Sequence, residues 1–175
     1  MKYININLTI VFLIIFFNCN LFAQHHNDSL LSQLSVKWAN AKDYTLKLAS
    51  LMPESEYDFK PVKDEMSFKE QLLHIRQNIL WLSGTYLLVK VTEQKDPKEM
   101  NKAAVIRSVS EAYDEGMKAH NITSSQLDEI VKFFAGPKSR RQMLILMHDH
   151  QTHHAGQLIV YLRLKGIKPP DYVGW

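Results

Sequence analysis

Apolar residues recur every three or four positions along four long stretches of the chain. The stretches cover residues 30–52, 67–91, 99–120 and 139–165. This spacing places the apolar side chains on one face of an α-helix, so each stretch is predicted to form an amphipathic helix. A shorter helix is expected over residues 126–134, and no segment alternates with the period of two that is typical of a half-buried strand. The pattern therefore predicts an all-α fold, with four helices of about twenty residues packed as a four-helix bundle.

Residues with special conformational preferences stand where these helices are expected to begin and end. Ser67 precedes the second helix, and Glu70 follows at the spacing of a capping box. Pro53 is expected to end the first helix and Gly166 the fourth. The segment 53–66 is predicted to be a long ordered connection.

The first 23 residues have the features of a secretory signal peptide. A single lysine precedes an almost wholly apolar core over residues 8–17. That core is too short for the roughly 20 residues of a membrane-spanning helix, and Ala23 supplies a small residue at a plausible cleavage point. We expect residues 1–23 to be removed and residues 24–175 to form one exported domain, periplasmic or secreted. An uncleaved anchor, or a lipid attached at Cys19, are the alternatives.

The composition excludes several classes of protein. With 175 residues, 46% hydrophobic and 22% charged, the chain matches an ordinary globular domain. The net charge of +3 includes no basic run longer than Arg140-Arg141, so the concentrated basic patch of a nucleic-acid-binding protein is missing. We expect no nucleic-acid partner and, after removal of the signal peptide, no membrane. The single cysteine excludes an intrachain disulfide framework and a thiolate zinc finger.

Four of the eight histidines lie between His148 and His154. At about 100° per residue, His150 and His154 fall about 40° apart, in the middle of the apolar stripe of the fourth helix. His148 falls about 160° from His150 and is expected to face solvent, with His153 near the edge of the stripe. Two inward imidazoles one helical turn apart can bind a single metal ion. The alternatives are hydrogen-bonded core histidines, or an exposed cluster with adventitious metal affinity.

A metal site of this kind needs a third ligand, and His74 is the best candidate. It lies in the middle of the second helix, on a face that is largely polar and therefore suits the wall of a pocket better than a packing surface. His120 stands at a helix end and is expected to be a C-terminal cap or a surface residue. Three neutral imidazoles leave a divalent ion with an open coordination position, which is the pattern of catalytic sites. Zinc, nickel, iron and manganese all accept imidazole, so the sequence does not select the metal.

Five further residues stand near the expected ligands. Glu70, Asn78 and Gln157 could hold the ligand rings in place through hydrogen bonds, although each type is also common on surfaces and at caps. Trp81 and Tyr161 share helix faces with the ligands and could line a pocket or simply pack in the core. No carboxylate falls in the middle of the face that carries the paired histidines, so the sequence identifies neither a general base nor any other catalytic residue.

Three segments resemble, in order, the DinB-like family of metal-binding four-helix bundles. They are residues 66–74 (MSFKEQLLH), 150–159 (HQTHHAGQLI) and 161–170 (YLRLKGIKPP). The resemblance extends over nearly all of the expected mature chain. One departure is Ala155, because many members carry arginine at this position. If this arginine binds an anionic substrate or a thiol cofactor in those members, that role is either absent from this chain or performed by another residue.

The resemblance implies an up-down-down-up bundle, a homodimer, and a divalent metal held by His74, His150 and His154. Some relatives transfer low-molecular-weight thiols such as bacillithiol or mycothiol, and many have no assigned reaction. We therefore expect an exported metal-dependent enzyme, a hydrolase or a thiol-linked transferase, that acts on a small molecule. A non-catalytic metal- or ligand-binding bundle, or a structural dimer whose metal only stabilises the fold, are the alternatives.

Overall fold

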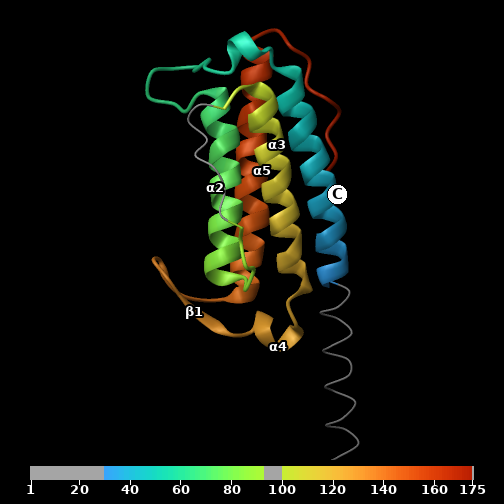
Figure 1. The fold of residues 1–175 in the computed structure, drawn as a ribbon, viewed down its shortest axis with the longest axis vertical. Coiled ribbons are helices and arrows are strands. Elements are labelled where there is room, and N and C mark those ends of the chain that lie inside the picture. The colour runs from blue at the N-terminus through green and yellow to red at the C-terminus, as the bar shows by residue number, and fades with distance from the viewer. Residues whose placement is uncertain (1–29, 93–99, 175) are drawn as a thin grey trace, which may run out of the picture.

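The computed structural model describes residues 30–92 and 100–174. In these described residues, four long helices lie side by side (Figure 1). They are the first helix (residues 30–51), α2 (Phe68–Tyr86), α3 (Lys102–Met117) and α5 (Arg140–Leu164). The colours of Figure 1 show that the first helix and α5 run in one direction, while α2 and α3 run in the other. The predicted, mainly helical fold is confirmed.

Side-chain caps explain where the helices begin. The Ser67 hydroxyl accepts a hydrogen bond from the Glu70 backbone N–H, and the Glu70 carboxylate accepts one from the Ser67 N–H, which confirms the predicted capping box. Ser139 and Gln142 form an equivalent box at the start of α5. Beyond α5, Gly166 has a φ of +71°, a left-handed conformation that glycine adopts without strain.

The helix ends differ from the prediction in two places. Helix α2 stops at Tyr86 rather than near residue 91, and Leu88 just beyond it has a positive φ of 62°. Helix α3 stops at Met117, and the chain continues as a 3₁₀-helix, η2 (Lys118–Asn121). Another 3₁₀-helix, η1 (Glu54–Glu56), lies in the ordered connection between the first helix and α2.

The expected helix over residues 126–134 is wrong. Only α4 (Ser124–Leu127) is helical, and the chain then forms an antiparallel hairpin of β1 (Ile130–Phe133) and β2 (Gly136–Ser139). The expectation that the chain has no strand is wrong for the same segment. The strands have four residues each and a single buried residue, Phe133, so they carry almost no period-two signal. The hairpin lies at the end of the bundle where α5 begins (Figure 1).

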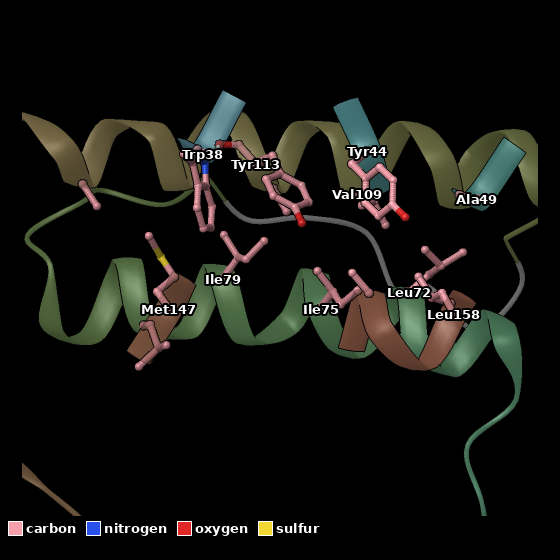
Figure 2. Packing of buried hydrophobic residues seen from close by; sticks show 14 of the residues in the cluster. Trp38, Tyr44, Ala49, Leu72, Ile75, Ile79, Val109, Tyr113, Met147 and Leu158 are labelled. Carbon is pink, nitrogen blue, oxygen red and sulfur yellow. Dashed lines mark hydrogen bonds between the residues drawn. The ribbon is translucent and has the colours of Figure 1, made fainter. Parts of the chain in front are cut away.

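Side chains from all four long helices meet in the core. Figure 2 shows Ile75 and Ile79 of α2 directed toward Val109 and Tyr113 of α3. Trp38 of the first helix is fully buried, and its indole N–H donates to the backbone oxygen of Tyr113 at 2.9 Å. Met147 and Leu158 of α5 belong to the same buried cluster, so the core packs α2 and α5, the helices that carry the histidines, against each other.

Among the described residues, no helix combines the length and the apolar character needed to cross a bilayer. The expected signal peptide, residues 1–23, lies outside the described residues.

Candidate metal centre

Three histidines from two helices converge at one point in the bundle. His74 comes from α2, and His150 and His154 come from α5. The centroid of the His74 ring lies 4.9 Å from that of His150 and 4.6 Å from that of His154, and the His150 and His154 centroids are 4.5 Å apart. One ring nitrogen from each residue lies within 4.8 Å of the other two, so the group could hold a metal ion.

The distances suit a zinc-like ion after small movements of the rings. Ligand nitrogens about 2.0–2.1 Å from a tetrahedral metal are about 3.4 Å apart. The nitrogens of the three rings lie within 4.8 Å of one another, so modest side-chain rotation would bring them to that spacing. In the described part of the chain, no carboxylate or thiolate joins this group.

Burial keeps the three imidazoles neutral. It lowers the pKa of His150 to about 4, with a further contribution from the positive charge that His74 would carry. It lowers the pKa of His154 to about 4, with His150 adding to the effect, and it also lowers the pKa of His74. At neutral pH each ring therefore keeps a lone pair on one nitrogen, which is the form that binds metals.

Sequence reasoning missed Gln71, which contacts a ligand candidate directly. Its Oε1 lies 2.6 Å from Nδ1 of His154, and its side chain is buried. Gln71 stands three residues before His74 on α2, a spacing that places it near His74 but does not reveal its contact with His154 on another helix. The amide nitrogen of Gln71 also lies 3.4 Å from the Tyr161 hydroxyl. The predicted pocket residue Tyr161 therefore contacts Gln71.

The other residues predicted to surround the site lie in different environments. Glu70 caps α2 and pairs with Lys60 at 3.1 Å. Gln157 Nε2 lies 3.3 Å from Nε2 of His153, and Asn78 is half-buried on α2. Trp81 is 38% exposed, and its ring packs against Tyr86 of α2 and Phe133 of the hairpin, with centroids 5.4 and 6.2 Å away.

The prediction that His148 faces solvent is wrong. Its side chain is buried, and its Nε2 lies 2.9 Å from Nε2 of His120. His120 is buried as well, although its Nδ1, 3.2 Å from the Met117 carbonyl oxygen, does cap the end of α3 as expected. The ring of Trp38 covers the pair, with centroids 5.0 Å from His148 and 5.7 Å from His120. His148 is buried because α5 packs on two sides, with His148 against Trp38 and His154 against His74.

An open cleft of about 560 Å³ adjoins the three-histidine group. His74 and Glu70 line it from α2, together with Arg76, and Lys60 and Asp64 line it from the connection before α2. A small molecule could therefore approach His74 from outside the bundle. Ala155, the position where many members of the resembled family carry arginine, is buried and is not part of this cleft.

Known proteins resemble this chain over most of its length. The model of the DinB family matches residues 24–174. The chain belongs to the DinB family. The protein YjoA of Bacillus subtilis is 25% identical over 145 residues, which cover 77% of this chain and 90% of YjoA.

Solved DinB-like structures share the fold. The crystal structure of the DinB-like YjoA from Bacillus subtilis superposes with a TM-score of 0.66 at 21% identity, covering 80% of this chain and 97% of that one. A DinB-like protein from Bacillus cereus gives a TM-score of 0.67 at 17% identity, covering 78% of this chain and 93% of that one. At these identities the structures establish the fold alone.

Proposed function

We propose that the protein is an exported, divalent-metal-dependent enzyme that acts on a small molecule. The observation that carries the proposal is the convergence of His74, His150 and His154, three neutral imidazoles from two helices, within 4.8 Å. A metal held by three histidines keeps an open position, where it can lower the pKa of a bound water to about 7 or polarise a carbonyl. Hydrolysis and thiol-linked transfer are the reaction classes that such a site serves.

The surroundings of the group support a site that admits a substrate. The cleft of about 560 Å³ beside His74 falls within the roughly 300–1,000 Å³ of small-molecule sites. Its lining mixes positive and negative side chains, including Lys60, Arg76 and Asp64. Such a lining suits a polar small molecule, which would contact His74 at the inner wall of the cleft.

A non-catalytic metal- or ligand-binding bundle is the second candidate, and one observation favours it. No carboxylate accompanies the three histidines in the described part of the chain, so no general base stands beside the metal position. A bound metal would then stabilise the fold or hold a ligand without turnover. Turnover assays with metal-loaded protein distinguish the two candidates.

Elemental mass spectrometry on untagged protein tests metal binding. We expect about one transition metal per chain in the wild type and none in His150→Ala/His154→Ala. His153→Ala is the matched control, because it removes an exposed histidine from the same helix and should keep the metal. A wild type that stays metal-free after incubation with zinc, nickel, iron and manganese salts would refute the proposal.

Export and self-association are separate parts of the proposal. The signal-like residues 1–23 predict a secreted product whose N-terminus is Gln24, and the intact mass of the exported protein tests this. The family resemblance supports a homodimer. Light scattering after size-exclusion chromatography should give twice the mass of the mature chain, and a monomer would contradict the homodimer.

A further inference from the structure

We propose that Gln71 is a positioning residue that fixes the tautomer of His154. The backbone carbonyl of Met66, acting through the Tyr161 hydroxyl, sets the orientation of the Gln71 side-chain amide. The hydrogen bonds run from Met66 to Tyr161, then to Gln71, then to His154. The effect of Gln71 on metal binding rests on the proposed function, whereas the tautomer of His154 exists without any metal.

The donor and acceptor roles in these three hydrogen bonds have only one consistent assignment. The Met66 carbonyl oxygen can only accept, so the Tyr161 hydroxyl donates its one proton there, at 2.7 Å. The Tyr161 oxygen must then accept from Gln71, which places the Gln71 amide NH₂ toward Tyr161 at 3.4 Å. The Gln71 carbonyl oxygen is therefore the atom that faces His154.

This orientation determines which nitrogen of His154 carries the proton. An amide oxygen only accepts, so Nδ1 of His154 donates to Oε1 of Gln71 across 2.6 Å. In the neutral ring the proton on Nδ1 leaves the lone pair on Nε2. Nε2 is thus the nitrogen of His154 that is ready to bind a metal.

Packing holds the Gln71 and Tyr161 side chains in place in the absence of a metal. Gln71 and Tyr161 are each 2% exposed, so water does not compete for their hydrogen bonds. The Tyr161 ring contacts Phe59 and Phe68 with centroids 6.1 and 6.4 Å away. A preorganised hydrogen bond of this kind typically increases metal affinity by about 10- to 100-fold.

The first test measures the tautomer in metal-free protein at neutral pH, by long-range ¹H–¹⁵N correlation spectra. His154→Gln identifies the His154 signals by their loss. We expect the wild type to show a protonated Nδ1 at His154, and Gln71→Met, which has no acceptor, to shift the ring toward protonation at Nε2. Gln71→Glu keeps an acceptor and should keep the wild-type tautomer. Retention of the wild-type tautomer in Gln71→Met would overturn the proposal.

The second test measures zinc affinity by competition with a chelating dye. We expect Gln71→Met to weaken binding by about 10- to 100-fold and Gln71→Glu to restore it. Tyr161→Phe, which releases the Gln71 amide to flip, should weaken binding by a smaller factor. Tyr57→Phe is the matched control, because the Tyr57 hydroxyl also donates to a buried backbone carbonyl, that of Ala49 at 2.8 Å, without reaching the histidines.

The two tests separate this inference from the proposed function. Equal weakening by Gln71→Met and Gln71→Glu would mean that Gln71 only supports the fold, and would overturn its positioning role. A wild type that shows the expected tautomer and binds no zinc would refute the metal site and leave the assignment of the His154 proton standing.

Discussion

Replacing Gly116 by alanine should destabilise the protein although alanine is the better helix former. Gly116 lies in the last turn of α3. A Cβ atom at this position would lie 2.6 Å from Cζ2 of Trp38 and 2.8 Å from Cγ2 of Ile79. Trp38 is fully buried and Ile79 is 1% exposed, so neither side chain has free space to move into.

The magnitude follows from two opposing terms. Overpacking a filled core costs about 1–3 kcal/mol, and two contacts below 3.0 Å place Gly116→Ala at the upper end. The propensity gain of alanine over glycine in a helix interior is at most about 1 kcal/mol, and it is smaller in the last turn. The variant should therefore lose about 2 kcal/mol of unfolding free energy, which corresponds to a Tm lower by roughly 4–8 °C for a chain of this size.

Gly156→Ala is the matched control. Gly156 lies in the interior of α5, and a Cβ atom there meets no other heavy atom within 4 Å. The propensity gain of about 1 kcal/mol should then appear undiminished as a stabilisation. Urea unfolding followed by far-ultraviolet circular dichroism measures both variants in metal-free protein. If Gly116→Ala were as stable as the wild type, the close approach of α3 to Trp38 would be refuted.

Three further predictions follow from the same structure. The unfolding free energy of metal-free protein should fall as the pH drops below about 6.5. Burial lowers the pKa of His120 and lowers that of His148 to about 3, so the unfolded chain binds protons that the folded chain excludes. Urea titrations at several pH values should show a shallower fall in the variant His120→Phe/His148→Phe. Ser139→Ala should cost about 1 kcal/mol in the same assay, because it removes the hydroxyl that caps α5, and an unchanged midpoint would contradict that role. Zinc should raise the Tm of the wild type in scanning fluorimetry and leave that of His74→Ala unchanged, since metal bound to the folded state alone stabilises it.

The sequence predicted the long helices and the three-histidine group because both depend on helical spacing. The apolar period located the four helices to within a few residues of their observed bounds at most ends. His150 and His154 lie one turn apart on α5, so any α-helix places them together. His74 required more, namely that the polar face of α2 packs against α5, and the polar character of that face was the available signal.

The hairpin and Gln71 were beyond the same reasoning for different physical reasons. The hairpin strands have four residues and pair only with each other, so tertiary context rather than periodicity decides their conformation. Gln71 is a buried polar residue whose role depends on a partner more than 80 positions away in the chain, and no local pattern encodes that pairing.

Helix α5 carries two groups of histidines whose ring nitrogens have different surroundings. Nδ1 of His148 is buried and has no hydrogen-bond partner among the described residues. Nε2 of His148 faces Nε2 of His120 at 2.9 Å, so a shared proton already occupies the space between the two rings. Among the described residues, the one side-chain hydrogen bond found for the rings of the three-histidine group is that of Gln71 with Nδ1 of His154. The three rings bring one nitrogen each to within 4.8 Å of the others, and neutral imidazoles can bind a cation through such nitrogens. The pair with His120 is therefore explained by a hydrogen bond and ring packing in the core, whereas the three-histidine group could hold a metal ion.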